Sequence, residues 1–440
     1  RLIRIEARLP EMRPLDWLRA QQGVTHYYWS DRERTFEMAG VSEADVLVPS
    51  GEVDLPALFA HMRAQLPPHY PHLRYFGGLR FHGGAVKSER WRAFKTYRFI
   101  VPRFEVVRRD ERLFLACNAV LGHPATNKRT LDSILDDLSR LQFPENPPPV
   151  VLPQRVTRSD HPDEAQWRIM VGRALDAMDQ GTLEKVVLAR ETCLSSEDRF
   201  DPVSLLSRLL HHTRQSFEFC FHPAPDRAFI GASPERLFKR QNCLLYSEAL
   251  AGTRPRGQTD DADRTFREDL LSHPKEQREH QFVVDALRAH FERFCRHVEV
   301  AEAPSVMRLR NCQHLVTPIQ GILRDNDVDA ALLEALHPTP AVGGCPREQA
   351  LEWIYREEPF DRGIYAAPVG WVAYDAAEFC VAVRSGLVQD HELALYNRAG
   401  IVPGATPRQE WEEMETKMGC YTQVLGQALA KGAAETRGTQ

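Results

Sequence analysis

The stretch 217–248, FEFCFHPAPDRAFIGASPERLFKRQNCLLYSE, decides the fold class. Its apolar and β-branched runs predict three strands in succession, at 217–222, 228–232 and 243–248. A further strand is predicted before them at 184–193, and another strand set at 363–396. Helical periodicity is confined to other segments, at 164–179, around 265–294 and at 406–430. Long strands in mixed order with helices predict an α+β fold rather than a regular βαβ repeat.

The proline-rich run PENPPPVVLP, residues 144–153, is the strongest break in the chain. Such a run is stiff and extended. Before it, the pattern predicts short strands and turns with helices at 54–65 and 130–141. The region 1–150 is therefore expected to be an N-terminal α/β part of the same fold, followed by a larger domain at 160–432.

Composition excludes several classes of function. The 440 residues carry a net charge of −5, which gives no support to a nucleic-acid partner. The basic and aromatic stretch 87–98, KSERWRAFKTYR, is predicted to be a strand or turn with a solvated face. No apolar run approaches the roughly 20 residues of a membrane helix. Nine scattered cysteines without a C-x-x-C pair favour a reducing cytoplasm.

Two E-x-x-E pairs lie near the starts of predicted helices. They are Glu276 and Glu279 in KEQREHQFVV, and Glu410 and Glu413 in TPRQEWEEMETK. Residues at i and i+3 share a helix face, and most such faces are simply solvated. Four carboxylates that converged in a buried site would repel one another unless a cation lay between them. Oxygen ligands of this kind favour Mg²⁺ over zinc.

The position of each pair favours the site over the solvated face. In the first helix the pair shares its side with Val283, Ala286 and Leu287, the core-facing side. In the second, Thr406 begins a capping box with Pro407 at the first helical position. The positive start of a helix also favours nearby anions.

A lysine and a glutamate elsewhere suit acid–base chemistry. Lys185 begins the strand EKVVLAR, where a lysine usually extends toward solvent. If it is buried instead, desolvation lowers its pKa and makes it a candidate base. Glu235 in IGASPERLF is either a solvated turn carboxylate or a buried acid that donates a proton. Together they could add water on one face of a substrate and expel hydroxide as water on the other.

Three further features suit an anionic substrate. The small residues at 251–254 in EALAGTRPRG predict a turn whose N–H groups can approach oxygen atoms. Arg384 is a charge inside an apolar strand pattern, so it needs an anion partner. Gly400 in AGIVPG precedes the capped helix. Taken alone, none of these features is specific, because loops and ordinary salt bridges explain each of them more simply.

Taken together, these segments resemble the chorismate-utilising enzymes, and most closely the isochorismate synthases. The resemblance runs from about 160 to 425 through KVVLAR, IGASPERLF, EALAGTRPRG, KEQREHQFVV, QHLVTPIQG, LHPTPAVGGCP, RGIYAAPVGW, VAVRS, AGIVPG and EWEEMETK. The N-terminal WLRAQQGVTHYYWSDRERTFEMAG is similar to isochorismate synthases of the menaquinone pathway. The resemblance implies large antiparallel sheets with outer helices, as in anthranilate and aminodeoxychorismate synthases, and a chorismate-binding catalytic domain at 160–432.

The resemblance also implies residue roles. Lys185 matches the base that activates water for attack on C2 of chorismate, and Glu235 matches the acid that protonates the departing C4 hydroxyl. Glu279 and Glu413 match direct Mg²⁺ ligands, while Glu276 and Glu410 match residues that hold metal-bound waters. The substrate-binding positions are Thr253, His314, Tyr365, Arg384, Gly400 and Lys417.

Other residues separate the branches of the family. Ala251 stands where aminodeoxychorismate synthases often carry a nucleophilic lysine, and Lys185 stands where ammonia-using relatives have Gln. No glutamine-amidotransferase elbow is present, so no such subunit is expected. Ala341 stands where salicylate synthases tend to have Thr. We expect a cytoplasmic isochorismate synthase of the menaquinone pathway, either monomeric or homodimeric. The alternatives are a salicylate synthase, a siderophore-pathway isochorismate synthase and a non-catalytic chorismate-binding relative.

One position departs from the resemblance. Relatives commonly read G-A-G-I-V where this chain reads Arg398-Ala399-Gly400-Ile401-Val402. Arg398 thus replaces a glycine whose backbone can lie against the substrate. Either the loop accommodates the side chain, or binding at that wall is altered. The usual serine before the last helix is Ala405, which leaves Thr406 as the cap.

Overall fold

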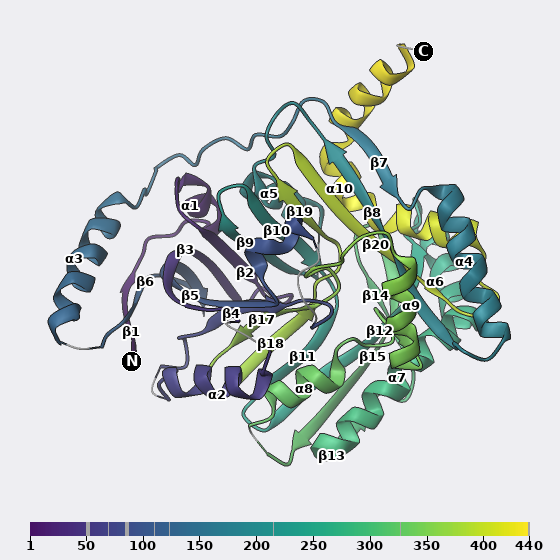
Figure 1. Cartoon of the computed structure of the whole chain (residues 1–440), viewed down its shortest axis with the longest axis horizontal. Coiled ribbons are helices and arrows are strands. Elements are labelled where there is room, and N and C mark those ends of the chain that lie inside the picture. Colours follow the sequence, from purple (N-terminus) through teal and green to yellow (C-terminus); the bar gives the residue numbers. More distant parts are fainter. Residues whose placement is uncertain are drawn as a thin grey trace.

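A computed structural model describes residues 1–438 except 50–52, 69, 84–87, 110, 123, 214 and 326. Long strands form the centre of the molecule and helices lie around the outside (Figure 1). All pairings between the described strands are antiparallel. The expected α+β architecture of large antiparallel sheets with outer helices is therefore confirmed.

The strands and helices alternate irregularly along the chain. The strands are β1 (Leu2–Arg8), β2 (His26–Ser30), β3 (Phe36–Leu47), β4 (Tyr75–Leu79), β5 (Tyr97–Arg109), β6 (Arg112–Val120), β7 (Thr157–His161), β8 (Lys185–Ser195), β9 (Phe217–Ala224), β10 (Arg227–Ser233), β11 (Arg236–Gln241), β12 (Leu244–Pro255), β13 (Cys295–Val300), β14 (Ser305–Arg308), β15 (Cys312–Leu323), β16 (Gly344–Cys345), β17 (Pro368–Val372), β18 (Ala376–Val381), β19 (Ser385–Gln389) and β20 (Glu392–Ile401). The helices are α1 (Pro14–Ala20), α2 (Leu55–Gln65), the 3₁₀ helix η1 (Glu89–Phe94), α3 (Pro124–Arg140), α4 (Glu164–Asp179), α5 (Pro202–His212), α6 (Asp260–Ser272), α7 (Pro274–Phe294), α8 (Asp329–Leu336), α9 (Arg347–Glu357) and α10 (Pro407–Gly438).

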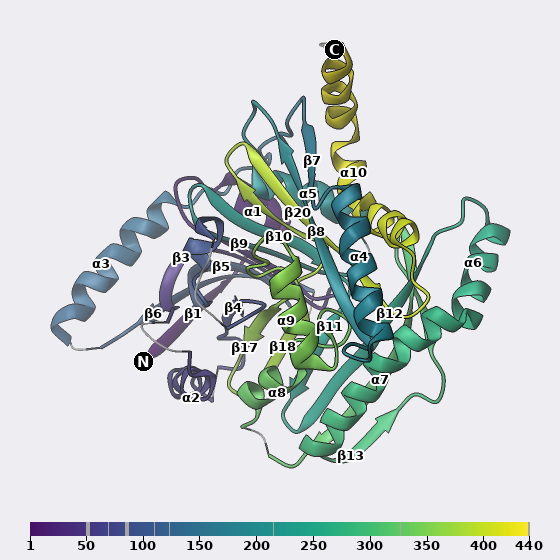
Figure 2. The same cartoon turned by 45° about the vertical axis from the view of Figure 1, so that its right-hand side comes forward.

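Strands from the first 120 residues pair directly with strands from the later part of the chain. β2 pairs with β9 and β4 pairs with β17. The proline-rich run at 144–153 contains neither helix nor strand. It crosses the outside of the molecule from α3, which stands apart in both views, toward β7 (Figures 1 and 2). The two parts of the chain therefore share hydrogen-bonded sheet structure.

Apolar packing fixes the two helices that carry the E-x-x-E pairs. In α7, Val283 and Leu287 are buried on the side that faces β12 and β15. In α10, Met414 is buried, and the indole nitrogen of Trp167 in α4 donates to the carbonyl of Pro407, 3.0 Å away. Each buried side chain of this size contributes about 1.5–3 kcal/mol. The periodicity argument for the first helix is confirmed, and both helices are held rigidly over the sheet.

Thr406 caps the start of α10 as the sequence predicted, although among the described contacts the reciprocal bond of the expected capping box, from the Thr406 backbone N–H to the Gln409 side chain, is not present. The hydroxyl of Thr406 accepts a hydrogen bond from the backbone N–H of Gln409 at 3.4 Å, and Pro407 is the first helical residue. The same hydroxyl donates to the Gln409 side chain at 2.8 Å. This arrangement orients the first turn of α10, which carries Glu410, and Glu413 follows in the next turn.

Two local predictions were wrong. Within 87–98, Glu89–Phe94 form η1 with Trp91 and Phe94 buried in the core, so this part is not a solvated strand or turn, whereas Tyr97 and Arg98 begin β5; Lys87 lies outside the described residues. Residues 251–254 form no turn but belong to β12. Gly252 has a φ of +79° and creates a bulge in the pairing with β15. A bulge re-aims side chains next to a site, and glycine adopts this φ without strain.

Candidate active site

The pairing of β8 with β20 brings the candidate base to the candidate substrate wall. Gly400 lies opposite Val187, and Arg398 lies opposite Ala189. Lys185, the first residue of β8, is fully buried, so of the two alternatives for this residue the structure shows the buried one that a candidate base requires. Its Nζ lies 3.3 Å from Oε1 of Glu279 on α7.

Burial and the ion pair with Glu279 shift the pKa of Lys185 in opposite directions. Burial lowers the pKa of Lys185, and the carboxylate of Glu279 offsets only part of that effect. The pKa of Glu279 lies below its usual value, because Lys185 and other nearby lysines outweigh the effect of burial. A lysine in this environment gives up its proton more readily than one in water, which is what a base requires.

The carboxylate of Glu279 occupies the space where a side chain at position 400 would lie. A Cβ at position 400 would lie 2.3 Å from Oε1 of Glu279 and 3.4 Å from Cε of Lys185. The first distance is far shorter than any real contact. The absence of a side chain at Gly400 therefore lets the carboxylate lie against β20.

The four glutamates of the E-x-x-E pairs converge around Lys275. Its Nζ lies 2.7 Å from Oε1 of Glu410 and 3.8 Å from Oε1 of Glu276. Glu413, Glu410, Glu279 and Glu276 all raise the pKa of this lysine. Thus the two helices, 135 residues apart in the sequence at this contact, present their acidic faces to each other.

Glu276 and Glu413 have further partners. The backbone N–H of Thr253 donates to Oε2 of Glu276 at 3.1 Å, and Arg254 Nη1 donates to Oε1 at 2.7 Å. Lys417 Nζ lies 2.6 Å from Oε1 of Glu413. Oε2 of Glu410 is buried and accepts no hydrogen bond from the residues that the structure describes. Burial, together with the charge of Glu413, raises the pKa of Glu410 to about 8.

This donor set suits a hard cation. Carboxylate oxygens from two facing helices are the ligands that Mg²⁺ prefers, and the unpaired oxygen of Glu410 lacks a partner that a metal-bound water would supply. In the described part of the chain no three acidic, His or Cys side chains are arranged tightly enough to hold an ion as they stand. Lys275 lies between them, so the cation would have to displace its ammonium group.

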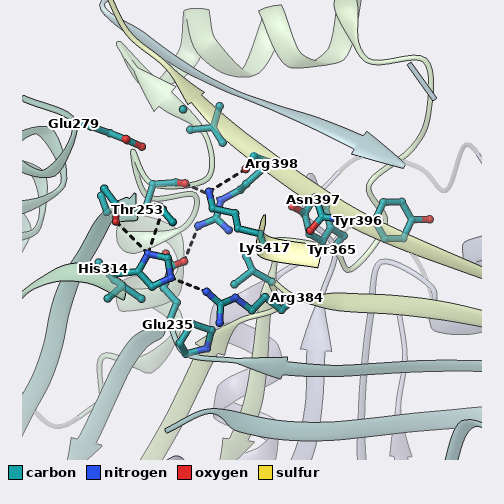
Figure 3. Close-up of a pocket in the computed structure, with 18 residues that line it drawn as sticks. Glu235, Thr253, Glu279, His314, Tyr365, Arg384, Tyr396, Asn397, Arg398 and Lys417 are labelled. Carbon is teal, nitrogen blue, oxygen red and sulfur yellow. Dashed lines mark hydrogen bonds and ion pairs between the residues drawn. The ribbon is translucent and has the colours of Figure 1, made fainter. Parts of the chain in front are cut away.

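A second group of predicted residues forms one chain of contacts, shown in Figure 3. His314 Nδ1 lies 3.0 Å from the carbonyl of Gly252 and 3.2 Å from the hydroxyl of Thr253, and Arg384 donates to Nε2 at 2.6 Å. Nε2 therefore accepts, and Nδ1 carries the proton. Burial and the charge of Arg384 hold the pKa of His314 well below its usual value, so the ring is neutral.

Arg384 is one of the residues that line the cavity. It lies in the bend between β18 and β19 with a φ of +50°, outside the strands. Its Nη2 contacts His314 and, at 2.9 Å, the sulfur of Cys312. Among the ion pairs of the described residues, none involves this guanidinium. Its charge is thus available to an anion in the cavity that it lines.

Glu235 follows β10 and is 4% exposed, which excludes a solvated turn carboxylate. Its Oε2 accepts a hydrogen bond from Arg398 Nη2 at 2.7 Å. Burial raises the pKa of Glu235, although Arg398 opposes this effect. The same arginine also donates from Nε to the carbonyl of Ala341 at 2.9 Å. Nearby in the cavity wall, the ring of Tyr365 stacks on that of Tyr396, with the ring centroids 5.1 Å apart.

The cavity between these groups has a volume of about 40 Å³. This is room for a few waters. Its walls include Glu235, Thr253, Glu279, His314, Tyr365, Arg384, Arg398, Gly400 and Lys417. Lys185 lies behind this wall, in contact with Glu279. Glu276 and Glu413 line an adjoining cavity together with Thr253, while Glu410 lies buried beside Lys275.

Sequence reasoning missed three contributors. Lys275 stands directly before Glu276, so its place beside the E-x-x-E motif was visible although its contact with Glu410 was not. Cys312 precedes His314 by two residues on β15 and was treated as one of the scattered thiols. Tyr396 lies on β20 and lines the pocket. In the sequence, only the alternation of residues along that strand could have indicated that its side chain points toward the site.

Comparison with known proteins decides the family. Residues 1–426 match the family described as "Chorismate binding enzyme". The chain belongs to this family. One relative is a chloroplastic isochorismate synthase of Catharanthus roseus. It is 32% identical to this chain over 411 residues, which cover 90% of this chain and 69% of that protein. The salicylate biosynthesis isochorismate synthase of Pseudomonas aeruginosa is 35% identical over 357 residues, 80% of this chain and 74% of that protein.

A solved relative matches the structure of this chorismate-binding enzyme over almost its whole length. The menaquinone-specific isochorismate synthase MenF from Escherichia coli superposes with a TM-score of 0.84 and 29% identity, covering 96% of this chain and 94% of that one. The resemblance identified from the motifs is therefore confirmed at the level of family and fold. Across the described residues, no helix combines the length and the apolar character needed to cross a bilayer.

Proposed function

We propose that the protein is a Mg²⁺-dependent isochorismate synthase, which converts chorismate to isochorismate. The observation that carries the proposal is the convergence of buried Lys185, buried Glu235 and two acidic helix faces on one site. The named relatives support it, because all three are isochorismate synthases.

The proposed reaction adds water at C2 of chorismate and removes the C4 hydroxyl, so atoms balance without an oxidant. Lys185, with its pKa lowered by burial, takes a proton from the attacking water. Glu235, with its pKa raised by burial, gives a proton to the departing hydroxyl. Because the nucleophile is water rather than ammonia, the proposal requires no glutamine amidotransferase subunit.

Two parts of the site suit the two carboxylates of the substrate. Glu279 and Glu413 would bind Mg²⁺, with Glu276 and Glu410 holding its waters. The ion would supply positive charge that anchors and polarises the ring carboxylate. On the other side, the guanidinium of Arg384 has no carboxylate partner among the residues that the structure describes, and Arg384 lines the same cavity as Tyr365 and Gly400.

We place the enzyme in menaquinone synthesis and in the cytoplasm. The match to a menaquinone-specific relative over 96% of the chain supports the pathway. All nine cysteines are free thiols, which supports a reducing compartment. Chorismate turnover tests the activity, and restored menaquinone content in a bacterium lacking isochorismate synthase tests the pathway. If the enzyme formed salicylate and pyruvate instead, the assignment would move to a lyase.

A further inference from the structure

Arg398 occupies the catalytic pocket as a cation bound to the candidate acid. Its Nη2 lies 2.7 Å from Oε2 of Glu235, and the Arg398 side chain is 13% exposed. The guanidinium approaches from β20, as Figure 3 shows, whereas Glu235 comes from the junction of β10 and β11. The contact therefore joins two strands across the cavity.

The arginine is held in place at several points. Its Nε donates to the carbonyl of Ala341 at 2.9 Å, and its own carbonyl accepts a hydrogen bond from Lys417 Nζ at 3.1 Å. The pairing of β20 with β8 does not depend on the side chain, because it runs through the backbone opposite Ala189. The guanidinium is thus aimed into the pocket by an otherwise regular strand.

Two features of this arrangement conflict with catalysis as it stands. The remaining cavity of about 40 Å³ is too small for a cyclohexadiene ring that carries one carboxylate directly and a second on a side chain. An arginine bound to Glu235 also stabilises the ionised carboxylate, whereas an acid must hold a proton. Movement of the guanidinium away from Glu235 would remove both obstacles.

We propose that Arg398 is a substrate-binding residue that transfers from Glu235 to the substrate carboxylate distant from the metal side. This inference rests on the proposed function. Arginine suits the role, because its planar guanidinium binds carboxylates with two parallel hydrogen bonds. Arg384 would flank the same carboxylate. Once released from Arg398, Glu235 remains in a buried position that favours its protonated, proton-donating form.

The test compares Arg398→Met, which keeps the length without the charge, with Arg398→Lys, which keeps the charge without the planar fork. Arg408→Met is the matched control, because Arg408 is an exposed arginine on α10 paired only with the surface residue Glu412. Steady-state kinetics with chorismate gives KM and kcat. Calorimetry gives the Kd for chorismate in the Lys185→Ala background, where turnover is blocked.

We expect Arg398→Met to raise KM and Kd by about 10- to 100-fold, the range for loss of a hydrogen bond between charged groups. kcat should change much less, and Arg398→Lys should recover part of the affinity. Unchanged KM and Kd with a lower unfolding midpoint would overturn the proposal in favour of a structural ion pair. Tighter chorismate binding by Arg398→Met would overturn it in favour of a simple obstruction.

The same measurements separate this inference from the proposed function. If the wild type binds chorismate without converting it, the proposed function fails while the comparison of Kd values still decides the role of Arg398. If the wild type does not bind chorismate, both are wrong.

Discussion

Lys185 Nζ lies 3.3 Å from Glu279 Oε1, which joins the candidate base to the candidate metal site in one buried contact. The pair spans β8 and α7, two elements that are 94 residues apart at this point. A cation bound by Glu279 would compete with Lys185 for the same carboxylate. Metal binding and the availability of the base are therefore coupled in this site.

Replacing Lys185 tests the base directly. Lys185→Met removes the amine while keeping most of the apolar stem, so we expect kcat for isochorismate formation to fall by about 10²- to 10⁴-fold, the usual contribution of a general base. The measurement is kcat at saturating chorismate and Mg²⁺. Lys95→Met, at an exposed lysine, serves as the control. Near-normal turnover by Lys185→Met would remove Lys185 from the reaction.

Replacing the two expected metal ligands tests the acidic faces. Glu279→Gln and Glu413→Gln each remove a charge at unchanged size, so the Mg²⁺ concentration for half-maximal activity should rise at least about tenfold. A matched change next to Glu413 is Glu412→Gln, whose side chain is 61% exposed and lies in the same turn of α10. A metal titration that does not differ between Glu413→Gln and Glu412→Gln would exclude Glu413 as a ligand.

Adding one methyl group at Gly400 tests the close approach of β20 to Glu279. Because the new Cβ would lie 2.3 Å from Oε1 of Glu279, the carboxylate of Glu279 has to move in the Gly400→Ala variant. We expect a loss of activity together with a higher Mg²⁺ requirement. Gly172→Ala in α4, where no atom lies within 4 Å of the new Cβ, should leave both unchanged. Full activity of Gly400→Ala at normal Mg²⁺ would show that the position of Glu279 is not critical.

The raised pKa of Glu410 predicts how stability depends on pH without metal. The folded protein holds this proton up to a pH of about 8, whereas the unfolded chain releases it near 4.5. The contribution of protonated Glu410 to the free energy of unfolding is therefore complete below a pH of about 4.5, and it is lost as the pH rises through about 8. We expect the metal-free protein to lose stability across this window, by at most about 1.4 kcal/mol per pH unit from this group.

Glu410→Gln should flatten this pH dependence, because the amide does not ionise. Denaturant unfolding at several pH values in the presence of a chelator measures the slope. Added Mg²⁺ should also reduce the slope in the wild type by stabilising the carboxylate. An identical slope in wild type and Glu410→Gln would assign the pH dependence to other groups.

Features that depend on local spacing could be predicted from the sequence. The 3.6-residue period placed Glu276 and Glu279 on the buried side of α7, and the Thr406 cap correctly marked the start of α10. The order of strands and helices likewise indicated the α+β class. The glutamate pairs, Lys185, Glu235 and Arg384 stood out in the sequence itself, and the family resemblance assigned their roles and added His314 and Tyr365, but neither gave contacts.

Features that depend on pairing between distant segments could not be predicted. The segment with Gly252 looks like a turn, and only its register against β15 makes it a bulge. Arg384 faces His314 from 70 positions away, and Arg398 reaches Glu235 across 163 positions. The sequence showed that Arg398 is unusual, while its partner followed only from the packing of β20 against the junction of β10 and β11.

The most direct test of the central claim is to incubate the purified protein with chorismate, with and without Mg²⁺, and to resolve the products by NMR. The account predicts isochorismate without pyruvate, formed only when Mg²⁺ is present. Salicylate with pyruvate, or no conversion despite bound chorismate, would contradict it.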